Sequence, residues 1–366
     1  MQSSKPILKI NLKNLRHNYE ALKKACPNAD VGAAVKADAY GLGVKEVAPV
    51  LISSDCKHFF VANCDEGIEL RLIIGGEANI YVFHGVFRNE LEAFLEHGLI
   101  PILNHLEQIK IWQEYANTLK RKLPCMIHID TGMHRLGMQE PEVNKLNLNL
   151  HTKDLDILCV ISHLTSAEDI GSDHNKIQLE RFAELSGKFK YSAKSLANSS
   201  GIFLGSDYHF DLARPGAAIY GINPTPYIDN SVIKPVASLF APIIQISTLL
   251  PGDGVGYNKT YTNISKSNKS CAIATIPVGY ADGFLRHFSN KGKVIIAGHE
   301  APIIGRVSMD LTIVDVSKIP ENLLFLGQSV ELLGENLTAD KIASLCDSNG
   351  YEILTSLGSR YERIYS

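Results

Sequence analysis

The chain has 366 residues, 45% of them hydrophobic and 20% charged, with a formal net charge of -3 at pH 7. This length exceeds what one ordinary hydrophobic core serves, so we expect a large domain and a smaller one. The weak charge argues against binding nucleic acid or an anionic membrane. The seven cysteines are scattered without CxxC spacing, which indicates neither a disulfide framework nor a zinc site. With no long apolar run and no apolar signal segment, we expect a soluble, cytoplasmic protein.

Short apolar runs alternate with amphipathic helical stretches through the first 220 residues. Eight runs have the composition of buried strands: 31–35, 59–62, 80–83, 100–103, 125–129, 157–161, 194–197 and 217–220. Helical patterns lie between many of them, at 12–26, 44–52, 65–72, 89–97, 106–119 and 175–187. This alternation predicts an α/β fold, a closed (β/α)₈ TIM-like barrel of parallel strands over residues 1–232. A doubly wound open sheet has a similar pattern and stays an alternative.

The pattern changes after about residue 233. Apolar runs at 240–250, 271–277, 293–297, 302–307, 311–316 and 329–333 are joined by Gly, Asp and Asn turns. Only two short helical patterns follow, at 338–346 and 351–357. We therefore expect a mostly β C-terminal domain over residues 233–366, with the boundary in the proline-rich stretch 223–235.

The most informative motif is the segment VKADAYGLG at residues 35–43. An apolar run brings Lys36 to the C-terminal end of the first predicted strand, and a glycine-rich turn follows it. Active sites of barrel enzymes collect at that end of the strands. A lysine amine in a partly apolar barrel mouth has a lowered pKa and can form a Schiff base with an aldehyde. Taken alone, a lysine at the end of a strand is more often a solvated surface residue.

This motif closely resembles the pyridoxal phosphate (PLP) attachment motif of the alanine racemases. The similarity continues in order along the chain, through FFVANCDEGIELR, HIDTGMHRLGM, ISHLTSAED, LANSSG, LARPGAAIYGINP, VGYNKTY, IPVGYADGF, GRVSMDLTIVDV and LGSRYERIY. The resemblance implies a barrel that binds PLP, a β domain, and a homodimer whose active sites combine both subunits.

The resemblance assigns two catalytic bases. Lys36 would carry the cofactor and act as one base, and Tyr257 in the segment VGY would be the second. Inversion of a stereocentre by deprotonation needs one base on each face of the Cα atom. A phenol with its ordinary pKa of about 10 is a weak base at neutral pH, so its neighbours must tune it.

The resemblance also implies the cofactor contacts. Arg214 would face the pyridine nitrogen, and His163 would stack against the ring. Arginine does not readily release a proton, so that nitrogen should stay unprotonated. The implied phosphate contacts are a tyrosine, a serine and two backbone amides after the late strands: Tyr40, Ser199, Gly216 and Ala217.

Substrate contacts are implied for four further residues. Arg135 would neighbour Tyr257, the Met309 amide and Asp310 would lie at the substrate carboxylate, and Tyr280 would narrow the entrance. The last three and Tyr257 fall in the predicted β domain, which in this family reaches the PLP of the partner subunit.

Three positions depart from the family pattern. His128 stands where many members have a carbamylated lysine that pairs with the arginine at position 135, so we expect a bound anion or a nearby carboxylate instead. Ser195 replaces a histidine that supports Arg214, and Ser359 replaces a phosphate-binding tyrosine of some members.

The leading hypothesis is reversible interconversion of L-alanine and D-alanine for peptidoglycan synthesis, with PLP as cofactor and no metal. A serine or broad-specificity racemase of the same family is the nearest alternative, because a methyl-sized difference in a pocket is worth only about 1–3 kcal/mol. A barrel-type PLP decarboxylase is disfavoured, since it needs no tyrosine base and would not place Arg214 at the ring nitrogen. A non-catalytic PLP-binding barrel would lack the β domain that carries Tyr257.

Overall fold

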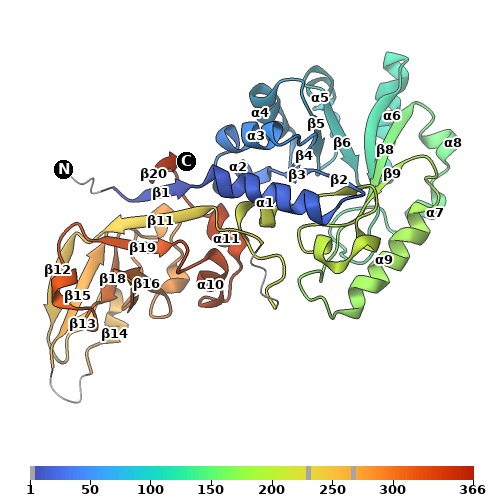
Figure 1. Ribbon diagram of the computed structural model, residues 1–366. Coiled ribbons are helices and arrows are strands. Elements are labelled where there is room, and N and C mark those ends of the chain that lie inside the picture. The colour runs from blue at the N-terminus through green and yellow to red at the C-terminus, as the bar shows by residue number, and fades with distance from the viewer. Residues whose placement is uncertain (1–4, 228–231, 265–268) are drawn as a thin grey trace. The chain divides into compact units, whose positions relative to one another are not determined.

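The computed structural model describes residues 5–227, 232–264 and 269–366. The chain divides into two compact units: a barrel unit, residues 15–234, and a β unit made of the residues up to Asn14 together with 235–366 (Figure 1). We had expected the first domain to begin at residue 1. The structure instead places strand β1 (Ile7–Ile10) between β11 (Ala237–Pro242) and β20 (Glu362–Tyr365). Leu8 and Ile10 are fully buried in that sheet, which explains why the N-terminal strand belongs to it.

The strands of the barrel unit are all parallel. Seven form one sheet, in the order β3 (Ala33–Ala34), β4 (His58–Val61), β5 (Asn79–Val82), β6 (Leu99–Leu103), β7 (Leu123–His128), β8 (Leu155–Ile161) and β9 (Ala193–Ser195). Strand β2 (Asp30–Val31) pairs with β10 (Leu212–Ala213), and the N–H of Asp211, just before β10, donates to the Lys194 carbonyl in β9. Because only Gly32 separates β2 from β3, the strands close into the predicted (β/α)₈ barrel.

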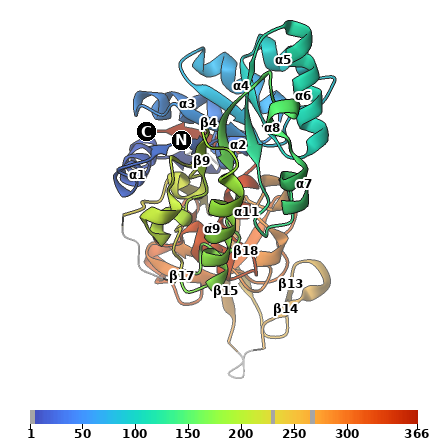
Figure 2. The same ribbon diagram turned by 90° about the vertical axis from the view of Figure 1, so that its right-hand side faces the viewer.

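Helices lie around the outside of these strands (Figures 1 and 2). They are α1 (Leu12–Ala25), α3 (Val44–Ser53), α4 (Cys64–Ile74), α5 (Leu91–Glu96), α6 (Leu106–Leu119), α7 (Glu140–Lys145), α8 (Leu148–His151) and α9 (Asp173–Ser186). The short segment α2 (Lys36–Gly41) follows β3 and is a left-handed turn. Helix α1 buries Leu15, Tyr19 and Leu22, which share one face at spacings of four and three. The six helices predicted from amphipathic spacing are all present, with ends that agree or differ by at most two residues.

One predicted barrel strand is wrong. Residues 217–220 form the 3₁₀ helix η3 (Ala217–Tyr220), and the eighth strand is the short β10 upstream of it. Pro215 offers no N–H to a strand ladder, and the Gly216 and Ala218 N–H groups donate to the Ser199 hydroxyl instead. All four residues of η3 are buried, so their apolar run has the same composition as a buried strand.

The described residues of the β unit form three sheets. The first sheet has six strands in the order β17 (His299–Pro302), β16 (Lys293–Ile296), β19 (Ser329–Leu333), β11, β1 and β20. The second has three, in the order β12 (Gln245–Leu249), β15 (Cys271–Ile276) and β18 (Thr312–Asp315). The third pairs β13 (Gly254–Val255) with β14 (Tyr261–Thr262). The predicted strand 240–250 is in fact two, in separate sheets. The strand predicted over 302–307 overlaps an observed strand only at its first residue, because β17 ends at Pro302. Beyond that, Ile303 forms an isolated bridge with Val314.

The remaining elements are short. The two predicted C-terminal helices are α10 (Ala339–Ser344) and α11 (Gly350–Thr355). Further 3₁₀ helices are η1 (Gly201–Leu204), η2 (Ser206–Tyr208), η4 (Tyr257–Lys259), η5 (Tyr280–Asp282), η6 (Arg286–Phe288) and η7 (Glu321–Leu323). Within the described residues, no helix is both long and apolar enough to cross a membrane.

Candidate active site

The rim formed by the C-terminal ends of the barrel strands carries the polar groups of the candidate site. Lys36 follows β3, Asn104 follows β6 and His128 ends β7. Ser199 follows β9, and Arg214 follows β10 directly. We had placed Arg214 before the eighth strand, and it in fact lies just after it. Parallel strands bring all these positions to one edge, where barrel enzymes build their active sites.

Lys36 begins a strained turn. Ala37, Asp38, Ala39 and Tyr40 all have left-handed backbones, with φ values of 53°, 52°, 53° and 57°. Such a conformation costs roughly 1–2 kcal/mol per non-glycine residue. The Glu66 carboxylate accepts from Ala37 N–H at 2.9 Å and from Ala62 N–H at 2.7 Å, which ties the turn to the end of β4. The turn that positions Lys36 is therefore strained, and the hydrogen bonds to Glu66 hold it in this conformation.

The Lys36 amine is half-buried in apolar company. Its Nζ lies 5.7 Å from the centroid of the Phe83 ring, just beyond β5. Burial lowers the Lys36 pKa and the Arg135 cation adds to this, while the Glu66 carboxylate opposes it. A lowered pKa increases the fraction of neutral amine, the form that attacks a carbonyl or accepts a proton.

Arg214 is a buried cation held by neutral groups. Its exposed fraction is 4%, and its guanidinium donates to the Ser195 hydroxyl and to the Ser162 carbonyl. Ser195 in turn donates to the Leu212 carbonyl, so this serine joins Arg214 to β10. Burial lowers the Arg214 pKa to about 10, so the side chain stays protonated at neutral pH. Among the described residues, no carboxylate forms an ion pair with it.

Ser199 lies in a cluster of backbone amides and tyrosines. Its Oγ accepts from Gly216 N–H at 3.0 Å and from Ala218 N–H at 3.2 Å, so its own proton points elsewhere. The Tyr40 and Tyr220 rings stack at 4.6 Å, and burial raises the pKa of Tyr40 to about 12. A Cβ on Gly216 would lie 2.3 Å from the Tyr40 hydroxyl, so only glycine fits there.

His128 is buried and neutral. Asn104 Nδ2 donates to the carbonyls of Phe83 and Ile102, at 2.9 and 3.0 Å, which turns its Oδ1 toward His128 Nδ1 at 2.8 Å. His128 Nδ1 is therefore the proton donor, and Nε2 carries the lone pair. Burial, helped by the Arg214 and Arg135 charges, lowers the His128 pKa to about 3, although Asp130 opposes this.

Arg135 has no carboxylate partner in the described part of the chain. Asp130, five residues before it, instead accepts from the N–H groups of Gly132 and Met133, and it pairs with His134 Nδ1 at 3.2 Å. The bound anion or nearby carboxylate expected beside Arg135 stays a prediction.

His163 follows Ser162 at the end of β8, close to these groups. The fully buried Gln178 of α9 donates to the His163 carbonyl at 2.9 Å and to Thr131 Oγ1 at 3.1 Å, and so it links two barrel strands. Burial lowers the His163 pKa well below its ordinary value, and the positive charge of Arg214 lowers the pKa further. Its ring is neutral, which suits stacking against an aromatic ligand.

The other four predicted site residues lie on loops of the β unit. Tyr257 follows β13 and is 69% exposed, Tyr280 begins η5 and is 44% exposed, and Met309 is 54% exposed. Asp310 pairs with Arg360, whose Nη1 lies 2.7 Å from Asp310 Oδ1. Ala217, predicted for phosphate binding, is buried in η3 of the barrel unit, and Ser359 is exposed.

Sequence reasoning missed several residues that organise the site. Glu66 and Asn104 hold backbone groups at the rim, Phe83 faces Lys36, and Asp282 and Arg360 join loops of the β unit. Glu66, Asp282 and Arg360 lie in the segments that carry the resemblance, but a residue's type does not show which group its side chain contacts. Only the fold reveals which groups their side chains meet.

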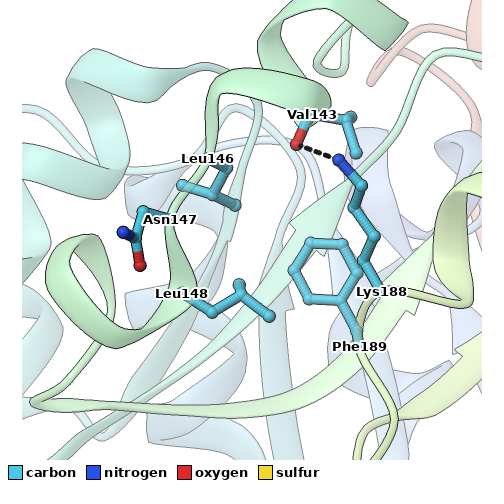
Figure 3. Close-up of a pocket in the computed structure, with 6 residues that line it drawn as sticks. All are labelled: Val143, Leu146, Asn147, Leu148, Lys188 and Phe189. Carbon is cyan, nitrogen blue, oxygen red and sulfur yellow. Dashed lines mark hydrogen bonds between the residues drawn. The ribbon is translucent and has the colours of Figure 1, made fainter.

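A second concave feature lies elsewhere on the barrel unit. This pocket has a volume of about 360 Å³. Its lining residues are Val143, Leu146, Asn147, Leu148, Lys188 and Phe189 (Figure 3). Its one cation, Lys188, donates to the Val143 carbonyl at 3.1 Å and to Asn144 Oδ1 at 2.7 Å. The pocket thus presents no uncommitted catalytic group, and no cluster of three or more metal-ligating side chains is found among the described residues.

The chain matches family models over both units. Residues 10–224 match the alanine racemase N-terminal domain, and residues 236–365 match the alanine racemase C-terminal domain. An alanine racemase of Rickettsia peacockii is 47% identical over 359 residues, covering 98% of each chain.

Solved structures agree. The Bartonella henselae alanine racemase, with covalently bound pyridoxal phosphate, superposes with a TM-score of 0.94 at 36% identity and covers 100% of both chains. The biosynthetic alanine racemase of Pseudomonas aeruginosa gives a TM-score of 0.91 at 31% identity, also over 100% of both chains. With a barrel rim built around Lys36 and Arg214, and with both domain models matched, the chain belongs to the alanine racemase family.

Proposed function

We propose that the protein interconverts L-alanine and D-alanine, with PLP attached to Lys36. The observation that carries this proposal is the pairing of a lysine of lowered pKa with a buried, carboxylate-free arginine on one rim of a barrel. The full-length similarity to alanine racemases names the reaction. The alternatives within the family differ in substrate breadth and use the same residues.

The donor set of the rim fits PLP. Lys36 offers an amine to the aldehyde, and Ser199 offers a hydroxyl proton that no described residue accepts. Tyr40, with its raised pKa, keeps its proton and can donate to a phosphate oxygen, as can the nearby Ala217 amide. The Gly216 N–H predicted for the same contact donates to Ser199 Oγ in this structure, so Gly216 contributes by holding that hydroxyl. Arg214 offers N–H groups to a ring nitrogen, and its buried charge gains a compensating partner there.

The residues divide the chemistry between them. Bound PLP supplies an electron sink that weakens the Cα–H bond of the amino acid. Lys36 Nζ holds or removes the proton on one face of Cα, and the Tyr257 hydroxyl does so on the other. Arg214 keeps its own protons, so it leaves the ring nitrogen unprotonated and limits how far negative charge spreads. His163 packs its neutral ring against the cofactor.

The exposed residues of the β unit support a shared site. Tyr257, Tyr280 and Met309 present large side chains to solvent in a single chain, and Met309 N–H has no acceptor among the described residues. We infer that the protein is a homodimer in which these groups, with Asp310, complete the site of the partner subunit. In such a dimer, Arg135 of one subunit would neighbour Tyr257 of the other. The enzyme would act in the cytoplasm and supply D-alanine for peptidoglycan.

The test combines cofactor attachment with a racemisation assay. Purified protein should be yellow, and borohydride should fix the cofactor to the peptide that contains Lys36. The assay compares L-alanine, L-serine and L-lysine, with chiral separation of products, and we expect turnover of alanine above the other two. Labelling of a different lysine, or no alanine turnover by the PLP-loaded protein, would refute the proposal.

A further inference from the structure

Three loops of the β unit meet around one carboxylate, Asp282. The loops are 279–283, 308–311 and 356–360. Asp282 is 2% exposed, and its Oδ2 accepts from Gly279 N–H at 2.8 Å. Its Oδ1 lies 3.0 Å from Nε of Arg360. A buried carboxylate is costly unless it is hydrogen-bonded and paired, and Asp282 obtains both kinds of partner from different loops.

Backbone contacts hold the three loops at close range. Tyr280 N–H donates to the Ser308 carbonyl and Ala281 N–H to the Met309 carbonyl, both at 3.0 Å. Gly358 N–H donates to the Asp282 carbonyl at 3.0 Å. The approach is so close that a Cβ on Gly279 would lie 2.3 Å from the Ser308 oxygen. The junction is therefore specified by glycine as well as by hydrogen bonds.

Arg360 spans the outer side of this junction. Its Nε contacts Asp282 in the first loop, and its Nη1 lies 2.7 Å from Asp310 Oδ1 in the second. The next residue, Tyr361, is 3% exposed, so the backbone beside Arg360 is anchored in the core. An arginine fork held at its base can fix two carboxylates at once, which a lysine ammonium does less well.

We propose that Arg360 is a positioning residue, one that fixes the Tyr280 loop against the Met309–Asp310 loop so that Tyr280 and the Met309 amide meet the substrate together. This inference rests on the proposed function for the identity of the substrate. It assigns Arg360 no contact with substrate or cofactor. Its role is to set the geometry of the loops before the amino acid arrives, which reduces the ordering that binding would otherwise require.

The test compares Arg360→Met, which removes both contacts, with Arg360→Lys, which can keep one. In the PLP-loaded enzyme, we expect Arg360→Met to raise KM for L-alanine about tenfold and to change kcat by less than about threefold, as for the loss of a charge-assisted hydrogen bond. Arg360→Lys should recover part of the KM. Arg88→Met is the matched control, since Arg88 also joins two carboxylates, Glu114 at 3.1 Å and Glu107 at 3.7 Å, with a side chain 59% exposed. It should leave both constants unchanged.

A second measurement does not depend on activity. Amide hydrogen exchange at Tyr280 and Ala281, whose N–H groups join the first loop to the second, should be faster in Arg360→Met than in the wild type or in Arg88→Met. Unchanged exchange together with an unchanged KM would overturn the positioning role. If the wild-type protein does not racemise alanine, the proposed function fails by itself, and the exchange rates still decide whether Arg360 joins the loops.

Discussion

The two units prepare their site residues in opposite ways. In the barrel unit, Arg214 and His128 are buried, with exposed fractions of 4% and 8%, and hydrogen bonds orient both. In the β unit, Tyr257 and Met309 are 69% and 54% exposed. The side chains of the barrel rim are thus buried and hydrogen-bonded within one chain, whereas those on the loops of the β unit are exposed to solvent.

This difference separates two tasks. A cofactor must be held for many turnovers, and the residues proposed to hold it sit on strand ends that are locked by the packed barrel. A substrate must enter and leave in each turnover, and most of the residues proposed to contact it sit on loops, held at their bases by contacts such as Asp282 with Arg360. Changes at the proposed cofactor residues of the barrel unit should therefore weaken or prevent cofactor attachment, and changes at the proposed site residues of the β unit should alter turnover while PLP stays bound.

The largest effect is expected for Lys36→Ala. This change removes both the attachment amine and one base, so borohydride should no longer fix the cofactor and racemisation should fall by about 10⁴-fold or more. Absorbance spectra and chiral product analysis measure the two effects. Lys45→Ala is the control, because Lys45 is an exposed lysine in the following helix. Retained attachment in Lys36→Ala would contradict the assignment.

Tyr257→Phe should keep PLP and lose one direction of proton exchange. We expect racemisation to drop by about 10²–10⁴-fold, the usual contribution of a positioned acid–base group. In D₂O, exchange of the Cα proton should persist from one enantiomer of alanine and fail from the other, and NMR can follow each. An equal loss from both enantiomers would refute the division into two bases.

Ser199→Ala tests the phosphate contact. The change removes a hydroxyl donor beside two backbone amides, and hydrogen bonds to charged groups contribute about 1.5–3 kcal/mol. PLP should therefore bind the apoenzyme about ten- to a hundredfold less tightly, measured by titration of the apoenzyme with PLP. Ser206→Ala, at an exposed serine in η2, is the control. Equal PLP affinity in the two variants would remove Ser199 from the cofactor site.

The smallest effect is expected for the pH dependence of stability. His128 has a pKa of about 3 in the folded chain and about 6.5 when unfolded. Between these values only the unfolded chain binds the proton, so the free energy of unfolding should decrease as the pH falls from 6.5 toward 3. His128→Gln should weaken this decrease, and urea unfolding of the apoenzyme at pH 7 and pH 5 measures it. His287→Gln, at an exposed histidine, should leave the slope as in the wild type; an identical slope in His128→Gln would contradict a neutral buried imidazole.

Much of the fold could be predicted from the spacing of apolar residues, but some element and domain boundaries could not be predicted in this way. Alternating apolar runs predicted the barrel and most of its helices. They could not separate the buried 3₁₀ helix at 217–220 from a strand, because the distinguishing partner is the distant Ser199 hydroxyl. They also could not place Ile7–Ile10 in the β unit, since its partner β20 lies at the other end of the chain.

The sequence motifs predicted the candidate site residues, but they did not predict the hydrogen bonds that hold those residues in place. Lys36 and Arg214 lie in segments distinctive enough to identify. The left-handed turn after Lys36 depends on Glu66, and the tautomer of His128 depends on the orientation of Asn104. These relations join side chains to backbone groups of neighbouring strands, and a linear sequence does not show which strands are neighbours.

The central claim is that Lys36 and Tyr257 of different copies form one active site, and subunit mixing tests it most directly. Lys36→Ala and Tyr257→Phe are each inactive, but a mixed dimer would contain one site with both wild-type bases. After unfolding and refolding together in equal amounts, half of the dimers are mixed, so about a quarter of all sites should be active. Recovery near this fraction of wild-type activity supports the claim. No recovery, with mixed dimers shown to form, would contradict it.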